Sequence, residues 1–259
     1  MPLLYLYDQC LQLMELKSSN RLSLDVWSEL RDDVNDALRG ECTSVELAAL
    51  ADTCRRHAVP KQFLFDMLDG VDYWIRFQQF ESFDELGVFA YRMGGAPLVA
   101  SVSILGFERP GYEVPAIRLG KAFFLTHLLS QACTQARANR ILFAQDDLKA
   151  TELDLQRFKL RQPSRALNHL VRLYARRILD RLREGSELLA YLEFDANRTM
   201  RSMIAAHWTM VTEMQRDPAA VFQPERLLSG KPLWSLRLRH LLGLEGNVPW
   251  LAETNGPGH

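Results

Sequence analysis

Apolar residues recur every three to four positions along almost the whole chain, and this spacing constrains its fold more than any other feature. Such spacing places apolar side chains on one face of a helix, whereas a half-buried strand alternates apolar and polar residues. No useful length of alternation interrupts the pattern, and no short repeat or linker divides it. We therefore expect an all-α chain folded as a single helical bundle.

Helix-capping serines and glycines indicate where several helices begin and where they pack closely. Ser44, Ser82 and Ser164 stand directly before apolar helical patterns and are predicted N-caps. The pair Gly94-Gly95 lies inside an apolar helix predicted from Phe83 to Leu105. Each glycine costs about 1 kcal/mol there relative to alanine, so the pair indicates close helix packing or room for a ligand.

Composition narrows the possible functions. The 259 residues carry 31 basic and 32 acidic side chains, so no overall field favours nucleic acid. Four cysteines without C-x-x-C spacing are typical of reduced thiols rather than of a zinc site. The start lacks a basic signal-peptide region, and the apolar run at 87–107 contains Arg92, which favours a buried core helix. We expect a cytoplasmic protein that makes peripheral membrane contact at most.

The segment from Leu119 to Arg140 is predicted to be the central helix, and it becomes polar in its last two turns. Gln131 and Gln135 are four residues apart and therefore lie one above the other. Two carboxylates at this spacing would suit Mg²⁺, but amides bring no negative charge. His127 lies among apolar residues of the same helix, where a structural histidine is commoner than a general base.

The sequence contains few other groups of residues that could bind a metal or catalyse a reaction. Asp69/Asp72, Asp84-Glu85 and Asp146-Asp147 are acidic pairs that we interpret first as helix starts or solvated groups. An arginine-rich pattern after Pro163 is interpreted as a solvated helix face. No phosphate-binding loop, dinucleotide fingerprint or H-E-x-x-H pair is present. A set of aromatic residues at helical spacing is typical of core, and less often of a tunnel for a long hydrocarbon; it comprises Phe63, Phe65, Tyr73, Trp74, Phe89, Tyr91, Phe123 and Phe124.

At the level of motifs the chain resembles the squalene/phytoene synthase family from about Leu6 to Arg239. Leu24-Asp25-Val26-Trp27 is similar to a Leu-Asp-x-Trp segment of that family. Met67 to Trp74 is similar to its Ile-Glu-Gly-Met-x-x-Asp helix, with Trp74 at the position of the Asp. Tyr91 to Gly95 is similar to its Tyr-x-Val-Ala-Gly helix, although the second glycine of that signature is replaced near Leu98.

The central helix carries the most specific match. The family residues retained in register are Leu119, Gly120, Ala122, Leu125, Thr126, Leu129, Arg140, Asp146 and Leu148. The two metal-binding aspartates of the family are replaced by Gln131 and Gln135. From Tyr7 to Leu11 the chain resembles the family's Tyr-x-x-Cys-Arg segment, which places the first pair of aspartates at Met14 and Ser18.

The resemblance implies an isoprenoid-synthase bundle with a central apolar cavity, formed by residues 1–245, without the family's N-terminal helices and with a flexible tail at 246–259. It also implies a role in isoprenoid metabolism. Because all four metal-binding carboxylates are replaced, we expect a catalytically impaired protein or pseudoenzyme that needs no cofactor and binds a prenyl chain or an active synthase partner. The alternatives are an active Mg²⁺-dependent transferase joining two prenyl diphosphates, and a helical interaction module. The candidate cavity residues are Tyr91, Gly95, Phe123, His127, Gln131, Gln135 and Arg140, the last matching a family basic residue near the diphosphate.

Overall fold

The computed structural model describes residues 2–18, 24–41, 44–77, 79–107 and 109–229, together with Trp250. Within these ranges the chain is helical and contains no strand, and the one bridge joins Phe107 to Leu192. The all-α prediction is confirmed. The predicted boundary at residue 245 and the predicted tail lie outside the described residues, apart from Trp250.

The first half of the bundle contains shorter helices. These are α1 (Pro2–Ser18), α2 (Leu24–Arg39), α3 (Val45–Arg56), α4 (Lys61–Arg76), α5 (Phe83–Ala90), the π-helical turn η1 (Tyr91–Gly95) and α6 (Ala96–Leu105). Ser44 and Ser82 cap α3 and α5 as predicted, because their side chains accept hydrogen bonds from the main-chain N–H groups of Leu47 and Glu85.

The second half contains the three longest helices. It consists of α7 (Glu113–Arg137), α8 (Gln145–Thr151), α9 (Leu155–Lys159), α10 (Arg165–Gly185), η2 (Ser186–Ala190), α11 (Phe194–Arg216), η3 (Pro218–Phe222) and α12 (Pro224–Ser229). Ser164 caps α10 as predicted. The acidic pair Asp146-Asp147, interpreted from the sequence as a helix start or a solvated group, lies in the first turn of α8.

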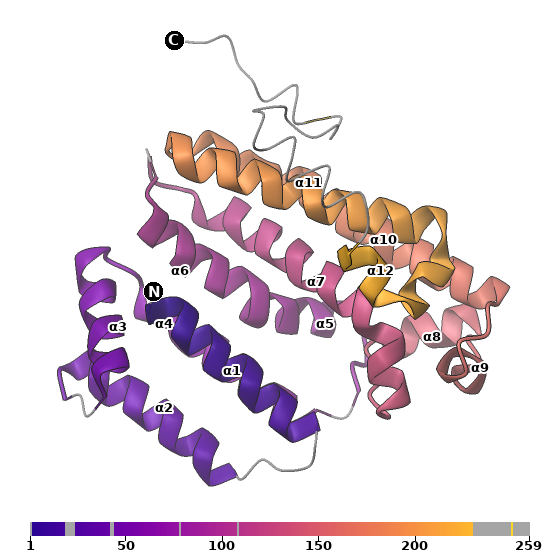
Figure 1. Cartoon of the computed structure of the whole chain (residues 1–259), viewed down its shortest axis with the longest axis horizontal. Helices are drawn as coiled ribbons and strands as arrows, with labels where there is room; N and C mark the ends of the chain where they lie inside the picture. The colour runs from indigo at the N-terminus through magenta and orange to yellow at the C-terminus, as the bar shows by residue number, and fades with distance from the viewer. Residues whose placement is uncertain are drawn as a thin grey trace.

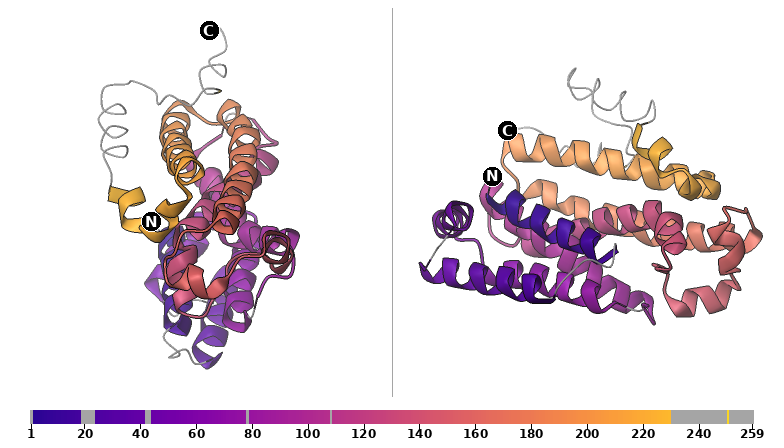
Figure 2. Two further views of the ribbon diagram at one scale, coloured as in Figure 1. Left: turned by 90° about the vertical axis from the view of Figure 1, so that its right-hand side faces the viewer. Right: turned by 60° about the horizontal axis from the view of Figure 1, so that its bottom comes forward.

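The helix α7 lies at the centre. On one side it packs against α5, η1 and α6, and on the other against α10 and α11. Farther out, α1 and α3 contact each other, as do α2 and α3 (Figures 1 and 2). The central position explains the composition of α7, because a helix covered on both sides needs apolar residues around most of its surface.

Glycines allow α7 to approach η1 closely. A Cβ built on Gly94 would lie 2.3 Å from the carbonyl oxygen of Gly120, and a Cβ on Gly120 would lie 2.3 Å from that of Gly94. The two backbones therefore touch at a point where no other residue fits. Close packing, one of the two roles expected for the Gly94-Gly95 pair, is thus found at Gly94.

The helical stretch Phe83–Leu105 combines α5, η1 and α6. It is long and apolar enough to cross a membrane by length and composition, and 56% of its most apolar window is buried inside the fold. Its contacts with α4 and α7 are those of a core helix, as expected from the sequence. The π-turn in its middle contains Tyr91 and Gly95, two of the candidate cavity residues.

Candidate functional site

Trp74 is the centre of the site, although it replaces an aspartate expected from the motif. It lies near the end of α4 and is only 4% exposed. Its indole stacks on Phe77, with ring centroids 5.3 Å apart, and on Phe89, at 5.6 Å and with nearly parallel planes. A flat apolar side chain thus fills the position at which a carboxylate was expected.

The same indole connects two other positions that the sequence singled out. Its Nε1 donates a hydrogen bond of 3.3 Å to the main-chain carbonyl oxygen of Met14 on α1. The guanidinium carbon of Arg140 lies 4.9 Å from the Trp74 ring centroid, within the range of a cation–π contact. Burial lowers the pKa of Arg140 from its usual value, but arginine remains charged in proteins.

The end of α7 brings two amides to this region. Gln131 and Gln135 are both half-buried, and the Arg140 N–H donates a 2.9 Å hydrogen bond to the Gln135 carbonyl oxygen, which closes the helix end. The side-chain Oε1 of Gln135 is fully buried and has no hydrogen-bond partner among the described residues. Asn139, two residues after the end of α7 at Arg137, has a φ of +61°, a left-handed conformation that asparagine tolerates.

These residues do not fit Mg²⁺. A hard cation needs oxygen ligands that include carboxylates, and Met14, Gln131 and Gln135 supply no negative charge. Ser18 is the last residue of α1, and its side chain lies outside the described part of the chain. In the described ranges no group of three or more His, Cys, Asp or Glu side chains could hold a metal ion.

Two histidines, one on α7 and one on α11, lie near an earlier part of α7. Phe123 stacks on His207 of α11 with ring centroids 4.1 Å apart, and His127 lies one turn beyond Phe123. Burial lowers the pKa of His127 and of His207, and the proximity of His127 lowers that of His207 further. His207 was not predicted, because a histidine on an amphipathic helix forms no motif and its partner lies 80 residues away.

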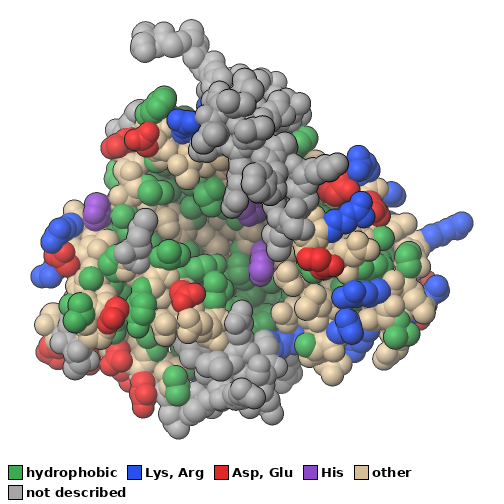
Figure 3. All heavy atoms as spheres, in the orientation of Figure 1, with side chains coloured by type: hydrophobic (Ala, Val, Ile, Leu, Met, Phe, Trp, Pro, Cys, Tyr) green, Lys and Arg blue, Asp and Glu red, His purple; other side chains and the backbone are tan. Residues whose placement is uncertain are grey.

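His127 is exposed to solvent and yet has its pKa lowered by surrounding protein. Its imidazole therefore lies at the surface but close enough to other protein atoms to be partly desolvated. Figure 3 shows a hollow in this face of the molecule, between α11 and α1 in the orientation of Figure 1. Its walls are mainly hydrophobic, with histidine side chains among them. We call this feature the central hollow.

Tyr91 and Gly95 have identifiable neighbours. The Tyr91 hydroxyl donates a short hydrogen bond to the Asp66 carboxylate on α4, and burial together with this bond raises the pKa of Tyr91. A Cβ on Gly95 would meet the Tyr91 ring at 3.1 Å and the Ile117 carbonyl oxygen of α7 at 3.3 Å. Both residues therefore help to seat η1 between α4 and α7, and their part in a ligand cavity stays a prediction.

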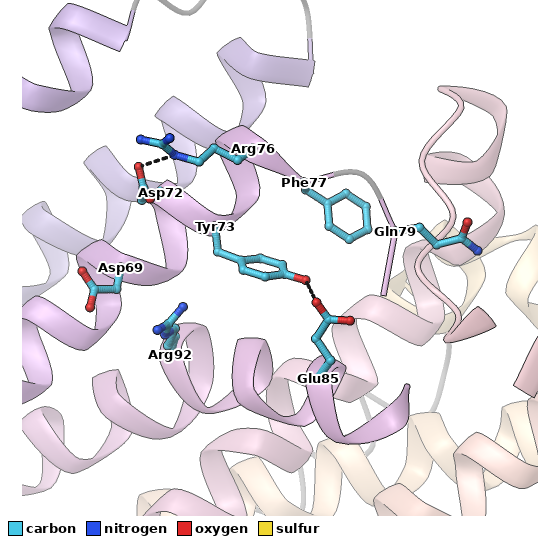
Figure 4. A pocket seen from close by; sticks show the side chains of 8 residues that line it. All are labelled: Asp69, Asp72, Tyr73, Arg76, Phe77, Gln79, Glu85 and Arg92. Carbon is cyan, nitrogen blue, oxygen red and sulfur yellow. Dashed lines mark hydrogen bonds and ion pairs between the residues drawn. The ribbon is translucent and has the colours of Figure 1, made fainter. Parts of the chain in front are cut away.

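A second depression, of about 370 Å³, collects several of the remaining acidic residues (Figure 4). Its lining is Asp69, Asp72, Tyr73, Arg76, Phe77, Gln79, Glu85 and Arg92. Asp69 pairs with Arg31 at 2.7 Å and Asp72 with Arg76 at 3.2 Å. Glu85 accepts a 2.6 Å hydrogen bond from Tyr73. Each carboxylate is thus already bonded to a protein group.

The arginine-rich helix α10 is only partly the solvated face that the sequence favoured. Arg172 and Arg176 are exposed as expected, but Arg177 is half-buried and forms two hydrogen bonds, of 2.6 and 3.1 Å, with the buried carboxylate of Asp147. Its guanidinium also covers the Phe83 ring at 4.1 Å. This contact attaches α8 to the bundle beside the end of α7.

Comparison with solved structures places the fold. A dehydrosqualene synthase superposes with a TM-score of 0.82 at 19% identity, covering 94% of this chain and 86% of that one. Squalene synthase HpnC from Alicyclobacillus acidocaldarius gives 0.74 at 12% identity, covering 83% and 82%. The predicted isoprenoid-synthase type of helical bundle is therefore confirmed.

Comparison with known sequences agrees with the comparison of structures. The phytoene synthase of Arthrospira platensis is 27% identical over 228 residues, which are 82% of this chain and 71% of that protein. The chloroplastic phytoene synthase of Daucus carota is 31% identical over 133 residues, 49% of this chain and 33% of that protein. The chain thus aligns with about a third of the plant enzyme. A family model described as squalene/phytoene synthase matches residues 1–236, and the chain therefore belongs to the squalene/phytoene synthase family of isoprenoid metabolism.

Proposed function

We propose that this chain is a family member without the Mg²⁺-dependent chemistry, and that it binds an isoprenoid chain in its central hollow. The observation that carries the proposal is the position of Trp74, whose indole bonds to the Met14 carbonyl and also contacts the Arg140 guanidinium. Three of the four implied metal-ligand positions have described side chains, and these are a thioether and two amides.

The physical argument concerns the leaving group. Ionising an allylic diphosphate requires cations to take up the charge that develops on the departing diphosphate. Carboxylates on two helices would hold those cations, and neither Met14 on α1 nor Gln131 on α7 is anionic. Removing a single preorganised stabilising group commonly lowers a rate by about 10²–10³, and here the whole set has been replaced.

The apolar walls support binding without catalysis. The central hollow exposes hydrophobic side chains, and the stacked rings of Phe123 and His207 offer a flat aromatic surface between α7 and α11. A prenyl chain needs a long apolar surface and few polar groups. Such a ligand partitions into membranes, which supports a cytoplasmic protein with peripheral membrane contact. Transfer of the bound isoprenoid to an active synthase partner is compatible with this function.

The active alternative would need other carboxylates to hold Mg²⁺. The candidates in the sequence were Asp69, Asp72, Asp84 and Glu85. The first two form ion pairs with arginines, and Glu85 accepts hydrogen bonds from the Tyr73 hydroxyl and the Glu81 N–H. Using them would mean giving up these interactions, so the geometry favours the non-catalytic function. A plain interaction module would have no ligand in the hollow.

The test is a Mg²⁺-dependent assay of purified protein with farnesyl and geranylgeranyl diphosphate, measuring release of diphosphate. A phytoene synthase assayed in parallel serves as the positive control. We expect no release above the protein-free rate, together with binding of a C15 or C20 isoprenoid. Sustained Mg²⁺-dependent turnover would contradict the proposal, and absence of any isoprenoid binding would favour the interaction module.

A further inference from the structure

The N-terminal half of α10 carries a row of cations on its solvent side. A depression of about 400 Å³ runs along this side, and its lining is Arg165, Asn168, His169, Arg172, Leu173 and Arg176. Neighbouring members of this set are three or four positions apart and therefore share one face of the helix. From Leu155 to Leu179 the chain contains seven lysines and arginines and no aspartate or glutamate. We call this face the α10 basic groove.

The row is unfavourable for the helix that carries it. Several exposed arginines elsewhere in the chain pair with a carboxylate one turn away, and an example is Arg56, whose guanidinium lies 2.6 Å from Asp52. In the α10 basic groove the residue one turn after Arg172 is instead Arg176. Like charges at this spacing destabilise a helix, so the stability of α10 does not explain the row. Binding of an anion would explain it.

Carboxylates near the α10 basic groove do not neutralise it. Asp147 of α8 bonds to Arg177, and Glu213 of α11 pairs with Arg216 at 3.0 Å. Asp180, one turn beyond the groove, forms no ion pair with any residue that the structure describes. The positive charge of the groove is therefore not offset by the elements that pack around it.

The arginines of the groove retain free donors. Arg172 is held against α11, because its Nε donates a 3.3 Å hydrogen bond to the main-chain carbonyl oxygen of Gln215. Asp217, two residues later, accepts hydrogen bonds from the main chain of η3. The guanidinium groups of Arg165 and Arg176 make no hydrogen bond or ion pair within the described ranges. Such groups bind phosphate oxygens through paired N–H donors.

The surroundings favour a phosphate presented on a membrane over a free one. The arginines of the groove are exposed, so they do not enclose a small ion. At the same end of the bundle, Leu160 is 68% exposed between Lys159 and Arg161, where α9 leads into α10 (Figure 1). An exposed leucine flanked by cations is typical of a surface that meets lipid head groups and the acyl chains beneath them. A nucleic acid backbone offers no apolar layer for this leucine.

We infer that the α10 basic groove binds the phosphate head groups of an anionic membrane, and that this end of the bundle is the part that contacts the bilayer. The inference goes beyond the proposed function, which concerns the central hollow, and does not depend on it. The chain as a whole has a net charge of −1 and is not drawn to an anionic surface. The attraction is therefore local, falls off within a Debye length, and fixes the orientation of the molecule on the membrane.

The test is co-sedimentation of the full chain with vesicles of phosphatidylcholine alone and of phosphatidylcholine mixed with phosphatidylglycerol, each at low and at high salt. We expect binding to the mixed vesicles only, and weaker binding at high salt. Each cation near an anionic surface contributes about five-fold in affinity. The double variant Arg165→Gln, Arg176→Gln should therefore bind about 10- to 30-fold more weakly. Its melting temperature should not fall, because the repulsion between residues 172 and 176 is removed.

The matched control is Arg55→Gln, Arg56→Gln, which changes the net charge equally at exposed positions on α3 and should leave vesicle binding unchanged. Equal loss in the two double variants, or equal binding to both kinds of vesicle, would overturn the inference. So would calorimetric binding of inorganic diphosphate that is lost in the Arg165 and Arg176 variant, because the groove would then take a soluble phosphate. Isoprenoid titrations are measured separately, so the failure of either proposal leaves the other intact.

Discussion

The indole Nε1 of Trp74 donates its hydrogen bond to the carbonyl oxygen of Met14, across a separation of 60 residues. This contact fixes the end of α4 against α1 at the place where the family resemblance implies opposed carboxylates. In a catalytic site, groups of like charge would face each other there and need cations between them. Here an aromatic side chain joins the two helices directly.

Replacing Trp74 should therefore reduce stability. Trp74→Ala removes a buried ring stacked on Phe77 and Phe89 and should lower the free energy of unfolding by about 3–5 kcal/mol. Trp74→Phe keeps a six-membered aromatic ring but removes the indole hydrogen bond to the Met14 carbonyl, which should cost about 1–2 kcal/mol. Urea unfolding followed by circular dichroism measures both.

Trp208→Phe is the matched control for the hydrogen bond. Trp208 is half-buried on α11, and its indole nitrogen makes no hydrogen bond within the described ranges. Its replacement should cost clearly less than Trp74→Phe. Equal losses in the two variants would mean that the bond to Met14 contributes nothing to stability.

Restoring one pair of carboxylates should not restore catalysis. The double variant Gln131→Asp, Gln135→Asp places two acidic groups on one face of α7 but none opposite them on α1. We expect no Mg²⁺-dependent release of diphosphate from farnesyl diphosphate. Adding Met14→Asp and Ser18→Asp completes the four positions, and Trp74→Asp supplies the carboxylate that the family motif has at residue 74. Turnover by the double variant alone would disprove this requirement.

The contact between Gly94 and Gly120 predicts opposite effects of two alanine substitutions. Gly120→Ala would place a Cβ 2.3 Å from the Gly94 carbonyl oxygen, so the helices must separate, at a cost of about 3 kcal/mol. Gly87→Ala is the control, because its Cβ would meet nothing closer than the Lys121 Nζ at 3.6 Å. That change should stabilise α5 by about 0.5–1 kcal/mol. Thermal unfolding of both variants checks the sign of each effect.

The features predicted correctly from the sequence are those set by residues close together along the chain. Helix caps at Ser44, Ser82 and Ser164 are local, because each side chain bonds to an N–H three residues later. The all-α class follows from spacing, and the family from residues that stand in register along α7. The bounds of α8 were not predicted, because this helix is held in part by tertiary contacts, notably the Asp147–Arg177 pair, that no local pattern reveals.

The site was predicted only in outline for the same reason. Gln131 and Gln135 were found because they interrupt a motif, and Trp74 was noted as a departure from another. Its bond to Met14 and its contact with Arg140 join segments separated by about 60 residues each, and no spacing rule links them. His207 belongs to no motif, and only the packing of α11 on α7 brings it against Phe123.

The pair Asp147–Arg177 should contribute far more than a surface ion pair. Its side chains are 11% and 29% exposed, and removing one partner leaves the other charge poorly solvated. We expect Asp147→Ala to lower the free energy of unfolding by about 3 kcal/mol. Asp52→Ala breaks the exposed pair with Arg56, with side chains 41% and 73% exposed, and should cost less than about 1 kcal/mol. Similar losses in chemical denaturation would contradict this ranking.

The histidines His127 and His207 should make stability depend on pH. Burial lowers the pKa of His127 and of His207 in the folded chain below the value of about 6.5 typical of an unfolded one. Below pH 6.5 the unfolded chain therefore takes up protons that the folded chain resists, and stability falls as pH decreases. Above about pH 7 both states are uncharged at these sites, and the dependence disappears.

The melting temperature, measured between pH 7.5 and 5.0, tests the contribution of this pair. The wild type should lose stability across this range, and His207→Asn should lose less, because the side chain at 207 can no longer be protonated and asparagine can still donate to the Met203 carbonyl that lies 2.8 Å from His207 Nδ1. His57→Gln, which alters an exposed histidine at the end of α3, should leave the pH dependence as in the wild type. An unchanged slope in His207→Asn would show that the acid sensitivity arises elsewhere.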